Sequence, residues 1–79
     1  MTTKYKIQSI IFDNSLNSYD ESLKWVLEHG YKPLKVDFTT HFFRFRILEP
    51  SDLEKKGYVN YRNKVFDKIK IRMFVIAYK

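Results

Sequence analysis

The sequence has no cysteine and only two glycines, Gly30 and Gly57. The absence of cysteine excludes disulfides and thiolate metal sites, and it leaves the redox compartment open. Two isolated glycines exclude a glycine-rich phosphate-binding loop. The two histidines are twelve residues apart and the carboxylates are scattered, which matches no metal-ligand spacing. We therefore expect neither a metal nor another cofactor.

Long hydrophobic runs are also absent. No stretch approaches the roughly 18 apolar residues that a membrane-spanning helix needs, and Lys6 and Gln8 interrupt the apolar positions near the N-terminus. These features predict a mature soluble protein without a signal peptide and without a membrane partner, and they make the cytosol the default compartment.

Aromatic and basic residues are abundant. Of the 79 residues, 44% are hydrophobic and 18% aromatic, which predicts one globular domain over residues 1–79 with one thin core. Fifteen Lys and Arg against nine Asp and Glu give a net charge of +6. This charge favours anionic partners such as nucleic acid, although lysines that only maintain solubility would give the same balance.

The order of local signals predicts an α+β fold. Ser18 and Glu21 form a capping box, and Gly30 suits the left-handed residue that ends a helix. The expected elements are a strand at 5–12, a helix at 19–29, strands at 34–39 and 41–48, a loop or short helix within 49–64, and a strand at 69–78. The order β-α-β-β-(loop or short helix)-β implies a two-layer sandwich, with one helix on one face of a mostly antiparallel sheet.

Alternation along the expected strands divides their residues between two faces of the sheet. The residues expected to face the helix are Ile7, Ile11, Leu34, Val36, Phe38, Phe43, Phe45, Ile71, Met73 and Val75. Those expected on the uncovered face are Lys6, Gln8, Lys35, Asp37, Phe42, Arg44, Arg46, Lys70, Arg72 and Phe74.

Residues suited to catalysis are sparse. His29 lies in the last turn of the expected helix, where it should contact the final carbonyls, and His41 begins a strand. Asp13 follows an apolar strand, as a nucleophilic aspartate would, but Ser15 stands where a second carboxylate would be expected. Asp13 is therefore interpreted as a turn residue. We expect a protein that is not an enzyme.

The uncovered sheet face is the candidate binding site. Arginine binds phosphate bidentately, and exposed rings offer platforms for unstacked bases. The candidate residues are Arg44, Arg46, Arg72, Lys70, Lys35, Lys6, Phe42 and Phe74. The same residue types are enriched at protein interfaces, so a second subunit or another protein is the alternative partner. A module of the RNA-recognition type is disfavoured, because arginines stand where that module has small glycines.

Four segments of the chain resemble a small domain of tailed phages and large DNA viruses, which stands alone or is appended to capsid-assembly proteins. The segments are "YKIQSIIFD", "KWVLEHGYKPLKVD", "FFRFRILEP" and "IKIRMFVIAY". In that family a Trp-apolar pair precedes His-Gly, matched by Trp25, Val26, His29 and Gly30, and a strand alternates aromatic residues with arginine, matched by Phe43, Arg44, Phe45 and Arg46.

The chain departs from the family pattern at Ile47, where members have Gln, and residues 51–66 have no match. The resemblance implies no established activity. It implies a viral setting, in the host cytoplasm or the virion, and a virion or genome-associated role. The expectation is thus a non-enzymatic module that contacts nucleic acid or an anionic surface; the alternative is a virion structural or assembly protein that contacts other capsid proteins.

Overall fold

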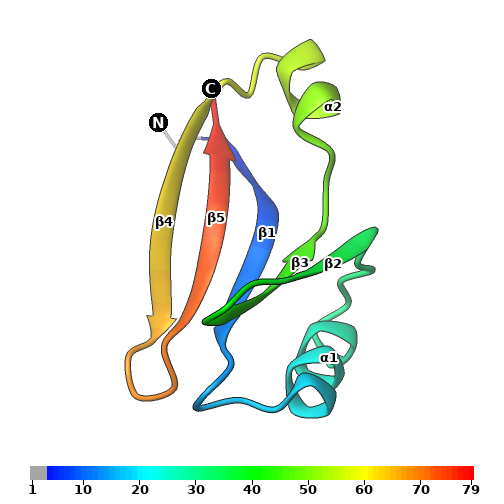
Figure 1. Cartoon of the computed structure of the whole chain (residues 1–79). Coiled ribbons are helices and arrows are strands. Elements are labelled where there is room, and N and C mark those ends of the chain that lie inside the picture. Colours follow the sequence, from blue (N-terminus) through cyan, green and yellow to red (C-terminus); the bar gives the residue numbers. More distant parts are fainter. Residues whose placement is uncertain (1–3) are drawn as a thin grey trace.

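The computed structural model describes residues 4–79 and contains a five-stranded antiparallel sheet with two short helices (Figure 1). The elements are β1 (Tyr5–Asp13), α1 (Tyr19–Glu28), β2 (Lys35–Phe38), β3 (Phe42–Arg46), α2 (Pro50–Lys55), β4 (Asn60–Asp67) and β5 (Arg72–Tyr78). The strand order in the sheet is β2-β3-β1-β5-β4. The predicted α+β class is confirmed, but the chain has one strand more than the predicted order.

Local chemistry sets both ends of α1. The Ser18 hydroxyl accepts a hydrogen bond from the Glu21 N–H at 3.1 Å, as an N-cap should. The reciprocal half of the predicted capping box is wrong, because the Glu21 carboxylate binds Lys70 and Arg72 instead. At the other end Gly30 has a left-handed φ of 83°, and the Tyr31 N–H donates a hydrogen bond to the Val26 carbonyl oxygen.

The predicted faces of β1 are wrong beyond Ile7. Ile10 and Phe12 are buried in the core beneath α1, and Ile11 points to the opposite face of the sheet. The cause is a β-bulge between Ile7 and Ser9, where the pairing with β5 shifts by one residue. Because the bulge resets the alternation, Ile7 and Ile10 share a face. Gln8, expected on the uncovered face, is buried within the bulge.

The predicted faces of β5 are inverted. Arg72 and Phe74 lie on the α1 side, because Phe74 pairs with Ile10 and contacts Trp25. Met73 and Val75 therefore face the other way. Ile71 is not in the strand at all: it occupies the turn before β5 with a left-handed φ of 51°. In β5 the alternation of side chains determines which residues share a face. The packing of large rings around Trp25 determines which of the two faces α1 covers.

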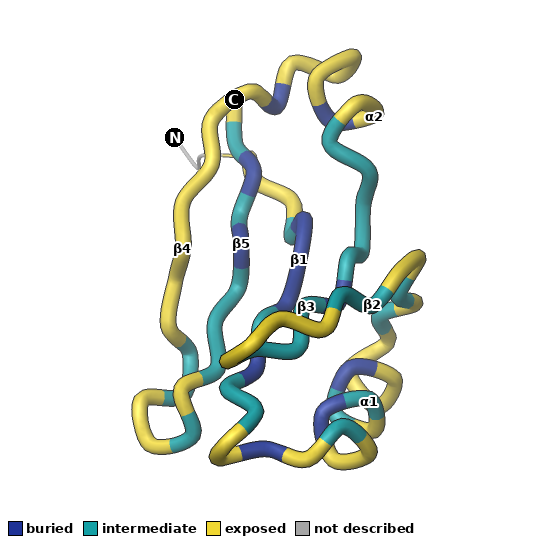
Figure 2. The backbone as a smooth tube through the Cα atoms, viewed as in Figure 1, coloured by how far each residue is buried: buried dark blue, intermediate teal, exposed yellow. Residues whose placement is uncertain are grey.

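The sequence does not predict strand β4, whose residues 60–64 lie in the segment expected to be a loop or short helix. It forms one edge of the sheet and pairs only with β5. Figure 2 shows that β4 is exposed over most of its length. An edge strand exposed in this way carries polar residues at most positions, so the apolar alternation that predicts a half-buried strand is missing. The predicted short helix is present as α2.

The two helices lie at opposite ends of the long strands (Figure 1). Helix α1 packs on one face, over a core of Ile10, Phe12, Val26 and Phe45, and the predicted helix-facing residues Val36 and Phe43 join it. Helix α2 packs on the other face, where Leu53 and Tyr58 cover Ala77. Phe38, in the short edge strand β2, also faces α1 as expected, with its ring centroid 5.4 Å from that of Tyr19, but it stays mostly exposed. Leu34, expected on the same face, lies before β2 and is mostly exposed too.

The diagonal placement of the helices leaves part of each sheet face uncovered. Within the described part of the chain, no helix has the length and hydropathy needed to cross a membrane.

Candidate functional site

The face opposite α1 brings together five of the eight predicted site residues: Lys6, Lys35, Phe42, Arg44 and Arg46. The guanidinium of Arg44 is engaged within the sheet. Its Nε donates to Ser9 Oγ at 3.3 Å and its terminal nitrogen donates to Gln8 Oε1 at 3.1 Å. Gln8 and Ser9 are buried in the bulge of β1, where the Ser9 hydroxyl donates to Gln8 Oε1 at 2.6 Å, and Arg44 adds a further donor to this buried pair.

Acidic neighbours pair with two of the other three cations of this face, Arg46 and Lys35. Arg46 lies 3.7 Å from Asp37 and 3.6 Å from Glu49, and Lys35 lies 3.5 Å from Asp37. Lys6 is directed toward the ring of Tyr58 at 6.0 Å. Phe42 is half-buried and is the first residue of β3, where its N–H donates to Thr39 Oγ1 across the β2–β3 turn. The predicted basic face is therefore largely paired internally.

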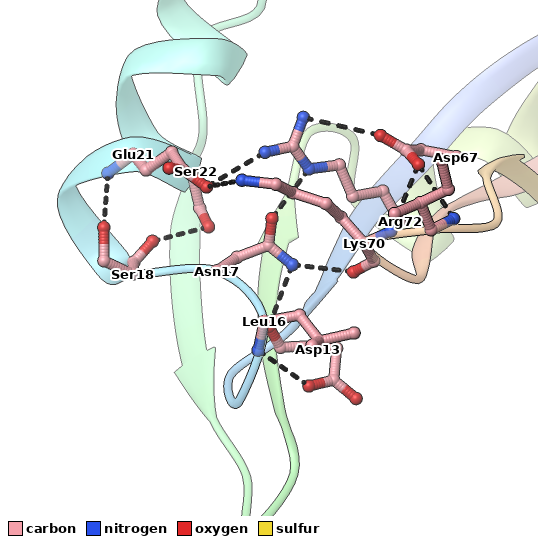
Figure 3. A network of polar contacts seen from close by, with 10 residues as sticks. Asp13, Leu16, Asn17, Ser18, Glu21, Ser22, Asp67, Lys70 and Arg72 are labelled. Atoms are coloured by element: carbon pink, nitrogen blue, oxygen red, sulfur yellow. Dashed lines mark hydrogen bonds and ion pairs between the residues drawn. The ribbon is translucent and has the colours of Figure 1, made fainter.

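Lys70 and Arg72 lie on the α1 side, in a network that ties the start of α1 to the β4–β5 hairpin (Figure 3). Arg72 donates to Asn17 Oδ1 at 2.7 Å and to Glu21 Oε1 at 3.1 Å, and its side chain is only 12% exposed. Lys70 donates to the same Glu21 oxygen at 3.1 Å. The hydrogen bond from Lys70 is the main cause that holds the pKa of Glu21 below its usual range, and Arg72 adds to it. These two cations are structural.

The eighth predicted residue, Phe74, belongs to a groove that the sequence did not reveal. The groove has a volume of about 700 Å³ and lies on the α1 side of the sheet, along β1, β5 and β4. Its lining residues are Tyr5, Ile7, Arg62, Asn63, Lys64, Phe66, Phe74, Ile76 and Tyr78. It occupies the part of this face that α1 leaves uncovered.

Cross-strand pairing arranges the residues that line the groove in rows across the sheet. Tyr5 pairs with Tyr78 at the end far from α1, and Ile7 pairs with Ile76 in the next row. In β4, Arg62 pairs with Ile76 and Lys64 with Phe74. Apolar and aromatic side chains of β1 and β5 therefore form the floor, and two cations of β4 line one edge.

The two cations of the groove lack acidic neighbours. Among residues 4–79, neither Arg62 nor Lys64 takes part in an ion pair. Both side chains belong to exposed residues on the edge strand. Their charge is thus available to an anion, in contrast to that of Arg44, Arg46 and Arg72.

Aromatic rings are fixed at the α1 end of the groove. Phe66 stacks on Phe74 with centroids 4.2 Å apart and on Trp25 with centroids 4.9 Å apart. Trp25 in turn stacks on His29, whose Nδ1 lies 2.8 Å from the Trp25 carbonyl oxygen, as expected for a histidine in a last turn. This stack seals the end of the helix against the sheet and closes one end of the groove.

Asp13 is a turn residue, as predicted. Its carboxylate accepts hydrogen bonds from the N–H and hydroxyl of Ser15 and from the Leu16 N–H. These bonds, the Ser15 hydroxyl first, lower the pKa of Asp13. In residues 4–79, no three His, Asp or Glu side chains gather as a metal site would require.

Comparisons of the chain with models of protein families, with curated proteins and with solved structures found no match. They give no support to the resemblance to a viral domain, which stays a prediction.

Proposed function

We propose that this protein is a non-enzymatic binding module that binds nucleic acid in the groove along β1, β5 and β4. The observation that carries the proposal is a pair of cations, Arg62 and Lys64, that form no ion pair with residues 4–79 and lie beside a floor of aromatic and aliphatic side chains. Nucleic acid offers both matching chemistries, phosphates for the cations and bases for the rings. The net charge of +6 would assist the encounter.

The groove suits nucleic acid better than the face first predicted. On that face a phosphate would have to displace Asp37 and Glu49 from Arg46, and Ser9 and Gln8 from Arg44. At the groove a phosphate would displace no carboxylate of the described residues from Arg62 or Lys64. The resemblance to a viral domain adds a setting, in which the bound nucleic acid would be a viral genome or transcript in the virion or the host cytoplasm.

Salt dependence tests the proposal. Fluorescence anisotropy with a labelled single-stranded oligonucleotide, measured between 50 and 200 mM salt, should show affinity falling steeply as phosphates release counterions. Replacing Arg62 and Lys64 by glutamine should weaken binding and lower the slope of log K against log salt by about 1.4, since each single-strand phosphate contact contributes roughly 0.7.

The matched control is the double variant Lys24→Gln, Lys32→Gln, which removes the same charge from exposed residues outside the groove. It should retain nearly the wild-type slope. Absence of salt-sensitive binding by the wild-type protein would refute the proposal, and an equal loss in both double variants would show that net charge alone is responsible.

The alternative function, a virion structural or assembly protein, is favoured by an apolar row on the face opposite α1. Val65, Met73 and Ile11 are consecutive neighbours across β4, β5 and β1, and Val65 is 44% exposed. A surface of this kind suits contact with another protein. Self-association in sedimentation experiments that Val65→Lys abolishes would support this function, and a monomer at high concentration would count against self-assembly.

A further inference from the structure

We infer that the groove takes single-stranded rather than duplex nucleic acid, with bases stacked on Tyr5 and Tyr78 and the phosphates along Arg62 and Lys64. This inference rests on the proposed function and specifies which form of nucleic acid the groove binds. It starts from the two tyrosines at the end of the groove far from α1, which are direct cross-strand partners.

The two tyrosine rings are free to receive a ligand. Tyr5 is 60% exposed and Tyr78 is half-buried. The other rings of the groove, Phe66 and Phe74, already stack on each other. Within the described residues, neither Tyr5 nor Tyr78 has an aromatic neighbour. Exposed rings of this kind offer the faces on which unpaired bases stack.

The positions of rings and cations give the ligand an orientation. The tyrosines come from β1 and β5, whereas Arg62 and Lys64 come from β4 at the sheet edge. The two cations are two residues apart, so their backbones are about 7 Å apart along the strand. A single strand lying along β4 would place its phosphates on these cations and turn its bases inward, over the tyrosines and Ile76.

The length of the groove fits a short run of nucleotides. From Tyr78 to Phe74 the floor spans five residues of β5, which are four steps of about 3.3 Å or about 13 Å in all. At 3.4 Å per stacked base, that length holds roughly four bases. Phe66 and Trp25 end the run on the α1 side.

The shape of the site disfavours a duplex. In a duplex the base faces are stacked on one another, and proteins reach the base edges with a helix or ribbon that protrudes into a groove of the nucleic acid. Here the rings lie in a hollow of the protein. A duplex could reach only the cations at the rim, so it would lose the contribution of the tyrosines.

The experiment compares two probes of equal nucleotide number, a labelled dT12 strand and a labelled six-base-pair hairpin closed by a non-nucleotide linker, by anisotropy at one salt concentration. Wild-type protein should bind dT12 at least tenfold more tightly than the hairpin. The variant Tyr5→Leu, Tyr78→Leu keeps apolar bulk but removes the rings, and should lose about tenfold in dT12 affinity for each ring, equivalent to about 1.4 kcal/mol of stacking. Its hairpin affinity should not change.

The matched control Tyr5→Phe, Tyr78→Phe keeps both rings and should bind dT12 like the wild type. The single variant Tyr5→Leu, at the more exposed position, gives a second measurement should the double variant fold poorly by circular dichroism. An acidic competitor, a dodecamer of glutamate, should not displace dT12 at concentrations where unlabelled dT12 does.

The outcomes separate the inference from the proposed function. Equal, salt-sensitive binding of both probes with no effect of the leucine variants would overturn the inference and leave nucleic-acid binding standing. Displacement of dT12 by the glutamate peptide at equal concentration would overturn it too, because recognition would then need charge alone. Binding of neither probe would refute the proposed function itself.

Discussion

Replacing Arg72 by methionine separates a structural arginine from a ligand-binding one. Methionine has an unbranched chain that replaces the aliphatic part of arginine, but it is shorter and removes the charge and the donors. The guanidinium donates to Asn17 and Glu21 and lies 5.6 Å from the centroid of the Phe12 ring. These contacts join the start of α1 to the first residue of β5.

The size of the effect follows from burial. Asn17 is 3% exposed, so loss of the donor to its Oδ1 leaves a buried acceptor unsatisfied, which costs about 1–3 kcal/mol. The interaction with the Phe12 ring contributes roughly 0.5–1 kcal/mol. The Glu21 carboxylate is exposed and screened by water, so it adds little. We expect a loss of about 2–4 kcal/mol, a large fraction of the 4–12 kcal/mol that is usual for a domain of this size, at about 0.05–0.15 kcal/mol per residue.

Urea unfolding followed by the fluorescence of Trp25, the single tryptophan, measures this loss. The midpoint should fall with the m-value unchanged, and the melting temperature should drop by at least about 10 °C. Arg62→Met is the matched control: Arg62 is exposed and forms no ion pair with the described residues, so stability should change by less than about 0.5 kcal/mol. A stable Arg72→Met protein with weakened nucleic-acid binding would refute the structural role and restore the one predicted from sequence.

Two further predictions concern stability. The folded-state pKa of Glu21 is lowered, so its stabilisation is complete above the ordinary carboxyl pKa and is lost as the pH falls through the lower folded value. In wild-type protein the urea midpoint should fall between pH 7 and pH 3, and Glu21→Gln should make that fall smaller. Some of the fall should remain, because the pKa of Asp13 is lowered too. An equally large fall in the variant would contradict this prediction. At Gly30 an added Cβ would meet no atom within 4 Å, so Gly30→Ala should cost only the backbone strain of its left-handed φ, about 1–2 kcal/mol. Gly30→Asn should cost less, because asparagine tolerates that conformation, and equal melting temperatures for the two variants would contradict the argument.

The parts of the fold that sequence predicted well depend on local chemistry. The hydroxyl of Ser18, the left-handed Gly30 and the turn chemistry of Asp13 act within a few residues along the chain, so their roles can be inferred without knowing the partner elements. The strands β2 and β3 were also found, since a short connection leaves an antiparallel hairpin as the natural pairing.

The faces of β1 and β5 depended on contacts that are distant in sequence. One extra residue at the bulge beside Gln8 reverses the alternation, and no feature of the neighbouring sequence predicts this bulge. In β5, residues 73 to 76 are apolar on both sides, so the pattern itself is symmetric. Phe74 rather than Met73 faces α1, because the flat ring of Phe74 packs against the rings of Trp25 and Phe66.

The site was mispredicted for a reason that concerns cross-strand neighbours. A residue on an interior strand has a neighbour on each side, and Arg44 in β3 lies between Asp37 of β2 and Ile11 of β1. Arg46, on the same face of the same strand, can likewise reach Asp37. Cations on interior strands therefore have two chances of meeting a carboxylate or a buried polar group, and here both arginines do.

A residue on an edge strand has a cross-strand neighbour on one side only, so it has half as many opportunities to meet a carboxylate or a buried polar group. Arg62 and Lys64 of β4 have cross-strand neighbours only in β5, and these are Ile76 and Phe74, which cannot neutralise a charge. The strand that alternation failed to detect therefore carries two cations that form no ion pair with the described residues. Basic residues on a sheet edge also discourage edge-to-edge pairing with another chain, but that role does not require an apolar hollow beside them. The hollow with Tyr5 and Tyr78 distinguishes a ligand site from a protected edge, which is why the tyrosine variants decide between the two.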